Sequence, residues 1–150
     1  VVSRDISEYK TDLIRENLER MNRRNVEVQV YDATVHDPEK EKYADVVLMD
    51  VPCSGLGVMG KKRDIKYHAT PESLQSITEL QRQIVAAGWQ YVKPHGVLLY
   101  STCTIHRGEN QEMEAWITEN FPFVLEEERQ LLPGTDETDG FYYARLRRKA

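Results

Sequence analysis

Val46-Val47-Leu48-Met49 is a short, continuous apolar run that ends at Asp50, and Val97-Leu98-Leu99-Tyr100 is a second run that ends at Ser101-Thr102-Cys103. Such runs, without polar alternation, are typical of strands that are covered on both faces in a parallel sheet. Between them, Thr70-Pro71 supplies a helix cap and a first-turn proline, and a long amphipathic helical pattern follows. Strand, helix and strand in this order indicate an α/β domain with a mostly parallel sheet.

The sequence on either side continues this alternation of strands and helices. Val1–Ser3 has the composition of a strand, a helical pattern runs to Arg24, and Val26–Val30 alternates between apolar and polar residues. The pattern beyond the second run predicts a helix over 109–120 and closing strands over 121–125 and 141–146. No repeat or linker divides the chain, so residues 1–150 are expected to form one domain.

Composition places the chain among ordinary globular domains. Of its 150 residues, 40% are hydrophobic, which is too many for a disordered chain, and no apolar stretch approaches the roughly 20 residues that span a bilayer. The N-terminus carries no secretory signal, and two cysteines do not make a disulfide scaffold, so we expect a cytoplasmic protein with no membrane partner.

Charge argues mildly against a general nucleic-acid binder, because 20 basic and 25 acidic residues give a net charge of -5. The net charge conceals two local clusters of basic residues. One contains Lys61, Lys62, Arg63 and Lys66, and the other contains Arg145, Arg147, Arg148 and Lys149. Most clusters of this kind are solvated surface, so neither one by itself indicates a function.

Chemically versatile side chains follow the predicted strands at the point where each strand ends: Asp5, Asp32, Asp50, Cys53 and Cys103. The carboxyl ends of parallel strands meet at one edge of a sheet, where ligands bind. Any single aspartate is as readily a turn or helix cap, and a lone cysteine is often a small buried hydrophobe. The joint placement is more informative, because the two thiols follow consecutive strands and share a crevice if those strands are neighbours.

Two thiols in one crevice suit a redox disulfide, half of a zinc site, or a nucleophile with a helper. The zinc site lacks ligands, because there is no C-x-x-C and His68, His95 and His106 show no ligand spacing, so we expect no metal. A phosphate-cradling loop does not fit after Cys103, where Thr-Ile-His-Arg is too short. Nucleophilic catalysis fits best, and a reversible disulfide stays as an alternative.

Gly55-Leu56-Gly57-Val58-Met59-Gly60 matches the dinucleotide-binding pattern G-x-G-x-x-G. The segment after Gly60 is basic and has no apolar helix face, and the acidic residue about twenty positions on, Glu79, lies inside a helical pattern. We therefore interpret the segment as a flexible, substrate-facing loop that leads into the basic cluster.

Asp50-Val51-Pro52-Cys53-Ser54-Gly55-Leu56-Gly57 and Ser101-Thr102-Cys103-Thr104-Ile105 together resemble the RNA cytosine-C5 methyltransferases of the Nol/Nop/Sun family, above all the bacterial Sun-type small-subunit ribosomal RNA enzymes. Three further segments resemble that family: the basic stretch Lys61–Tyr67, the pair Glu109-Asn110, and Asp139-Gly140-Phe141-Tyr142-Tyr143-Ala144. Each piece is weak alone, whereas the ordered set is specific. The resemblance implies a Rossmann-like fold that uses S-adenosylmethionine and an RNA substrate, with ribosomal RNA favoured.

The resemblance also implies roles for individual residues. Asp5 would hold the ribose hydroxyls of the cofactor, and its neighbour Ile6 would also contact the cofactor. Asp32 would lie by the adenine, and Asp50 would face both the methionine end and the target base. Cys103 would be the nucleophile and Cys53 would assist product release. Lys61, Lys62, Arg63 and Lys66 would contact RNA phosphates.

The chemistry explains why two thiols and an acid are needed. Cytosine C5 is too weakly nucleophilic to take a methyl group directly, so a thiolate adds at C6 while a proton is supplied at N3. A base must afterwards remove the C5 proton so that the thiol can leave. The target base also has to be unstacked, which favours single-stranded or loop RNA.

In the resembled family, a Gly-rich loop follows a first strand that lies at the centre of the sheet, and neither has a counterpart here. We therefore expect an N-terminally truncated, partial catalytic domain with poor cofactor affinity. The missing central strand leaves a gap in the sheet. Either the strands on the two sides of this gap pair with each other, or a second copy of the chain completes the sheet and makes an oligomer. Two other functions remain open: a noncatalytic RNA-binding or assembly module, and a thiol-disulfide protein that uses Cys53 and Cys103.

Overall fold

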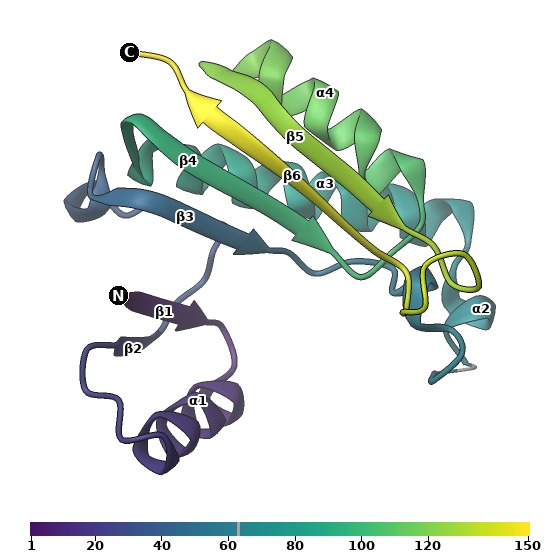
Figure 1. Cartoon of the computed structure of the whole chain (residues 1–150), viewed down its shortest axis with the longest axis horizontal. Coiled ribbons are helices and arrows are strands. Elements are labelled where there is room, and N and C mark those ends of the chain that lie inside the picture. The colour runs from purple at the N-terminus through teal and green to yellow at the C-terminus, as the bar shows by residue number, and fades with distance from the viewer. Residues whose placement is uncertain (63) are drawn as a thin grey trace.

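The structure, a computed structural model, describes residues 1–62 and 64–150 and has a smaller and a larger lobe (Figure 1). The smaller lobe contains β1 (Val2–Asp5), α1 (Glu8–Arg20) and β2 (Glu27–Val30). The larger lobe contains β3 (Ala44–Asp50), α2 (Ile65–His68), α3 (Pro71–Gly88), β4 (Val92–Thr102), α4 (Gln111–Asn120), β5 (Phe123–Leu131) and β6 (Phe141–Arg148).

The strands form two separate sheets. In the smaller lobe, β1 pairs with β2 in parallel, and in the larger lobe the strand order is β3-β4-β6-β5. β3 and β4 are parallel, whereas β6 is antiparallel to both β4 and β5 because the loop after β5 returns the chain to the adjacent position. The predicted α/β fold is confirmed, and its parallel strands are the ones that end at the candidate site.

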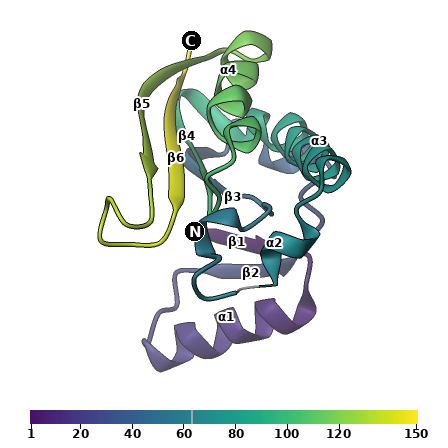
Figure 2. The same cartoon turned by 90° about the vertical axis from the view of Figure 1, so that its right-hand side faces the viewer.

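β1 and β3 are not hydrogen-bonded to each other, so the strands beside the expected gap do not close on one another. The prediction that residues 46–49 are covered on both faces is wrong. α3 and α4 cover only one face of the larger sheet (Figure 2), and on the other face Val46 and Leu48 are 58% and 64% exposed.

The core lies between the covered face of the larger sheet and the two helices. Apolar side chains of α3 and α4 pack there against β4 and β6, with Val85, Leu98, Ile117, Ala144 and Leu146 fully buried. Thr70 and Ser73 form a capping box at the start of α3, as the sequence predicts for Thr70. α3 ends at Gly88, and β4 begins at Val92.

Candidate active site

The loops that carry the two cysteines leave neighbouring parallel strands side by side. Asp50, the last residue of β3, pairs in register with Ser101 of β4. Cys53 and Cys103 therefore meet: their Sγ atoms lie 2.9 Å apart, and the Cys103 amide donates to Cys53 Sγ at 3.2 Å. Both are free, half-buried thiols. The predicted approach of the two thiols is thus observed.

The surroundings make the two thiols unequal. Burial, together with the hydrogen bond and charge of Cys103, raises the pKa of Cys53 to about 12. At neutral pH Cys53 therefore keeps its proton. A thiol held in this form is a poor nucleophile.

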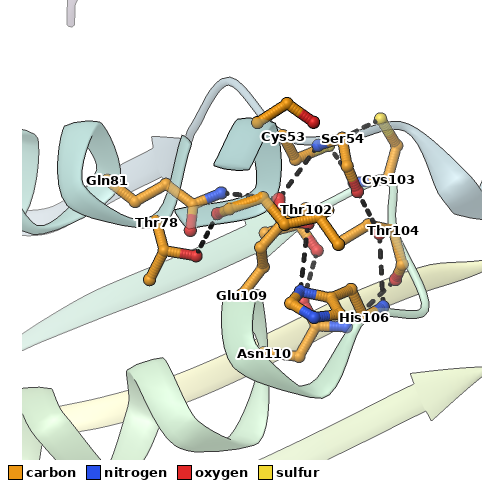
Figure 3. A network of polar contacts seen from close by, with 12 residues as sticks. Cys53, Ser54, Thr78, Gln81, Thr102, Cys103, Thr104, His106, Glu109 and Asn110 are labelled. Atoms are coloured by element: carbon orange, nitrogen blue, oxygen red, sulfur yellow. Dashed lines mark hydrogen bonds and ion pairs between the residues drawn. The ribbon is translucent and has the colours of Figure 1, made fainter. Parts of the chain in front are cut away.

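Beneath the thiols lies a network of polar contacts around Glu109, which is fully buried (Figure 3). Glu109 Oε2 accepts hydrogen bonds from the Ser54 amide and from Gln81 Nε2, each at 2.9 Å. The Ser54 and Thr104 hydroxyls are 2.8 Å apart and join the two cysteine loops directly. Sequence reasoning missed Gln81, although a polar residue on the apolar stripe of a helix was the available signal.

Asn110 fixes the loop that follows Cys103. Its Oδ1 accepts a 2.7 Å hydrogen bond from the Thr102 hydroxyl, and its Nδ2 donates to the Thr104 carbonyl at 3.0 Å and to Gln130 Oε1 at 2.7 Å. Residues on both sides of Cys103 are thus tied to one buried amide.

The glycine segment after Cys53 is anchored in the site instead of being the flexible loop that the sequence suggested. The Gly57 amide donates to the Cys103 carbonyl at 3.1 Å, and the Gly57 carbonyl accepts from the Gly140 amide at 2.8 Å. Gly55, whose φ is +72°, makes the left-handed turn that leads into this contact. The segment around Gly140, which leads into β6, therefore contacts the Cys53 loop at Gly57 and the Cys103 loop at Ile105.

A cavity of about 230 Å³ opens beside Cys53. It lies between the Cys53 loop, α2 and the first half of α3, and its lining is mostly apolar. The lining residues are Cys53, Ser54, Ile65, His68, Ala69, Ser73 and Ile77. The Cys53 side of the pair therefore faces a hollow.

Asp50 and Asp5 lie at the carboxyl ends of β3 and β1, as predicted. Asp50 is exposed, and its Oδ1 accepts a 3.3 Å hydrogen bond from the Ser101 hydroxyl. Asp5 Oδ1 accepts the Ser7 amide at 2.8 Å, so this aspartate also makes a local turn. Ile6, beside Asp5, is 67% exposed.

Asp32 lies just beyond the end of β2. Hydrogen bonds from the side chain and amide of Thr34 hold the pKa of Asp32 below its usual value. Asp5 and Asp32 therefore lie beside strand ends of the smaller sheet and not, as predicted, at the same sheet edge as Asp50 and the two cysteines, because the two sheets are separate. Each of these two carboxylates also stabilises its own turn.

The predicted RNA-binding cluster lies on the surface that follows the glycine segment. Lys61 forms an ion pair with Asp139, Lys62 is exposed, and Lys66 lies over the Tyr67 ring. Arg63 lies outside the described residues. In the C-terminal cluster, by contrast, Arg145 and Arg147 pair with glutamates of β5, and Arg148 donates to backbone carbonyls, which favours a structural role.

Residues 1–62 and 64–150 contain no group of three or more His, Cys, Asp or Glu side chains that could hold a metal ion. Nor does this part of the chain include a helix that is long and apolar enough to cross a membrane.

Comparison with known proteins identifies relatives over nearly the whole chain. Residues 1–147 match the family described as 16S rRNA methyltransferase RsmB/F. Ribosomal RNA small subunit methyltransferase F of Pectobacterium carotovorum is 30% identical over 168 residues, covering 100% of this chain and 35% of that protein. The chain spans about a third of the length of the curated relatives it matches.

Solved structures give the same picture. The crystal structure of PH0851 has a TM-score of 0.90 and 29% identity, covering 97% of this chain and 36% of the other. The structure of NSun6 from Pyrococcus horikoshii with SFG has a TM-score of 0.85 and 25% identity, covering 99% of this chain and 41% of the other. The expected Rossmann-like methyltransferase fold is thus confirmed.

Proposed function

Since this chain belongs to the 16S rRNA methyltransferase RsmB/F family, we propose that it transfers a methyl group from S-adenosylmethionine to C5 of a cytosine in ribosomal RNA. The family match supports the coarser part of this proposal, S-adenosylmethionine-dependent methyl transfer to ribosomal RNA. One observation carries the finer assignment: the Cys53 and Cys103 sulfurs lie 2.9 Å apart at the ends of adjacent parallel strands.

The unequal thiols support a division of labour. Cys103 adds to C6 of the cytosine as a thiolate, and N3 takes up a proton, which makes C5 nucleophilic. Burial holds the proton on Cys53, so this thiol does not compete as nucleophile. Once C5 carries the methyl group, a water ordered by the Cys53 thiol takes the C5 proton while the bond between C6 and the Cys103 sulfur breaks; Cys103 leaves as a thiolate and N3 gives back the proton that it took up.

The residues at the strand ends fit the cofactor. The Asp5 carboxylate suits the ribose hydroxyls, and the exposed side chain of Ile6 offers an apolar surface to an adenine ring. Asp32 would lie by the adenine, and the exposed Asp50 would face the methionine end and the target base. When bound, S-adenosylmethionine supplies an electrophilic methyl group.

Lys61, Lys62 and Lys66 are the proposed phosphate contacts of the RNA, together with Arg63. Their position supports this role, because they directly follow the glycine segment that is hydrogen-bonded to Cys103. Four expectations stay predictions: that the chain is a partial catalytic domain, that its cofactor affinity is poor, that it is cytoplasmic, and that it forms an oligomer through its unpaired strand edges.

The test is a methyl-transfer assay in which the chain, or a longer protein that contains it, is incubated with small-subunit ribosomal RNA and excess S-adenosylmethionine. Mass spectrometry of the digested RNA should find 5-methylcytosine for the wild type and none for Cys103→Ser. The control variant Ser76→Ala removes an exposed hydroxyl of α3, leaves both thiols in place and should retain activity. A Cys103→Ser variant that methylates cytosine like the wild type would refute the proposal.

The short sulfur separation also favours a second candidate, a reversible disulfide. Equilibration of the chain with reduced and oxidised glutathione at a cytosolic ratio, followed by alkylation and mass spectrometry, separates the two. The methyltransferase proposal expects two alkylated thiols, whereas a predominantly oxidised pair would favour the thiol-disulfide function.

A further inference from the structure

The peptide groups on both sides of Cys53 are held by the same two buried side chains. Gln81 Nε2 donates to the Pro52 carbonyl and to Glu109 Oε2, each at 2.9 Å. The same Glu109 oxygen accepts the Ser54 amide at 2.9 Å. Because Pro52 and Ser54 flank Cys53, these bonds fix the direction in which the thiol leaves the backbone.

Glu109 belongs to the other side of the site. It lies six residues after Cys103 in the chain, and its carbonyl accepts a 2.8 Å hydrogen bond from the buried Tyr100 hydroxyl of β4. Its second carboxylate oxygen, Oε1, is buried without a hydrogen bond and lies 3.4 Å from His106 Nδ1. One carboxylate therefore joins α3, the Cys53 loop and the segment that follows Cys103.

Packing alone does not explain this arrangement. Glu109 and Gln81 both have no exposed surface, and burying a carboxylate is costly unless its partners are well placed. Apolar side chains of similar volume would fill the space without that cost. Buried hydrogen bonds rigidify the groups that they connect, and here those groups include the peptide groups on both sides of Cys53.

We propose that Glu109 and Gln81 are positioning residues that hold the Cys53 thiol against Cys103. The catalytic consequence rests on the proposed function, because fixed thiols matter for adduct release, whereas the sulfur geometry is testable without it. In Figure 3, Gln81 extends toward the Cys53 loop from the left and Glu109 lies below that loop.

The affinity for phenylarsine oxide reports directly on whether the Cys53 and Cys103 sulfurs are held close together. The chain has two cysteines, and the reagent reaches high affinity only where two thiols approach one arsenic atom. Two S–H bonds are exchanged for two As–S bonds, the arsenic oxygen leaves as water, and nothing is oxidised. Titration followed by intact-mass spectrometry gives the affinity, and Cys53→Ser and Cys103→Ser calibrate the loss of bidentate binding.

Glu109→Ala and Gln81→Met should each weaken arsenical binding about tenfold or more, since each removes hydrogen bonds that orient the Cys53 loop. Glu109→Gln should retain most of the affinity, because an amide oxygen still accepts both N–H groups. Glu114→Ala is the matched control, since Glu114 is also buried but lies on α4 and has no hydrogen bond to either cysteine loop among the described contacts.

Circular dichroism and urea unfolding accompany each variant, and Gln81→Met decides the outcome if Glu109→Ala does not fold. Wild-type arsenical affinity in a folded Glu109→Ala or Gln81→Met variant would overturn the proposal, as would equal losses in Glu109→Gln and Glu109→Ala. In the methyl-transfer assay, Glu109→Ala should lower kcat and leave KM for RNA unchanged. Loss of arsenical affinity without any methyl transfer by the wild type would retain the positioning role and reject the proposed function.

Discussion

Gly57 is the point where three segments of the site interlock through their backbones, so Gly57→Ala is a sharp test of the geometry. An added Cβ would lie 2.2 Å from the Gly140 oxygen and 2.8 Å from the Cys103 oxygen. Both neighbours are backbone atoms, which cannot swing aside as a side chain can. The Cys53 loop must therefore move away from the Cys103 loop.

The loss of stability can be worked out from the hydrogen bonds that this movement breaks and from the overpacking that the added methyl group causes. The two hydrogen bonds of Gly57, to Cys103 and Gly140, contribute about 0.5–1.5 kcal/mol each, and overpacking a filled site costs roughly 1–3 kcal/mol. We expect Gly57→Ala to lower the free energy of unfolding by about 2–6 kcal/mol, a large part of the roughly 5–15 kcal/mol of a typical domain.

Urea unfolding followed by tryptophan fluorescence measures this change. Gly60→Ala is the control in the same segment, because a Cβ there meets nothing within 4 Å, and it should change stability by less than about 0.5 kcal/mol. Gly57→Ala should also weaken phenylarsine oxide binding, since it separates the thiols. A Gly57→Ala variant as stable as Gly60→Ala would refute the backbone interlock.

Three further predictions concern charge. The folded state raises the pKa of Cys53 to about 12, so between pH 9 and 12 the folded chain keeps a proton that the unfolded chain loses. The free energy of unfolding should therefore fall as pH rises from about 9 toward 12. Urea midpoints measure this, and over the same pH range the midpoint of Cys53→Ser should fall less than that of the wild type. Lys62→Ala and Lys66→Ala should each weaken RNA binding and reduce its salt dependence by about one counterion, as fluorescence anisotropy at several salt concentrations measures; an unchanged salt slope would exclude phosphate contacts. Asp5→Asn should lower S-adenosylmethionine affinity about tenfold in calorimetric titration, whereas the exposed Asp12→Asn should not, and equal affinities would contradict the ribose role.

The sequence predicts the approach of the two thiols because it depends on rules that act locally. Continuous apolar runs mark the two strands, and the capped helix between them requires a crossover that leaves the strands parallel. The loops that carry Cys53 and Cys103 must then leave the same edge of the sheet. The strand patterns also predict Asp5 and Asp50 at the ends of their strands and Asp32 just beyond the end of β2.

Other features depend on contacts that no local pattern contains. Val46 and Leu48 are exposed because whether a strand is covered on its second face depends on distant elements, and the helices of the larger lobe cover one face only. The anchoring of Gly57 requires Gly140, far along the chain. Glu109 and Gln81 are separated from Cys53 in sequence, so their convergence on its two flanking peptide groups is visible only in the fold.

The most direct test of the central claim is to map the covalent bond between protein and RNA. RNA that contains 5-fluorocytidine traps the adduct, since fluorine at C5 blocks the proton removal that releases the thiol. After incubation with S-adenosylmethionine, nuclease and protease digestion and mass spectrometry should find the nucleotide on the peptide that contains Cys103. A nucleotide on Cys53, or no adduct in a preparation that binds the RNA, would contradict the account.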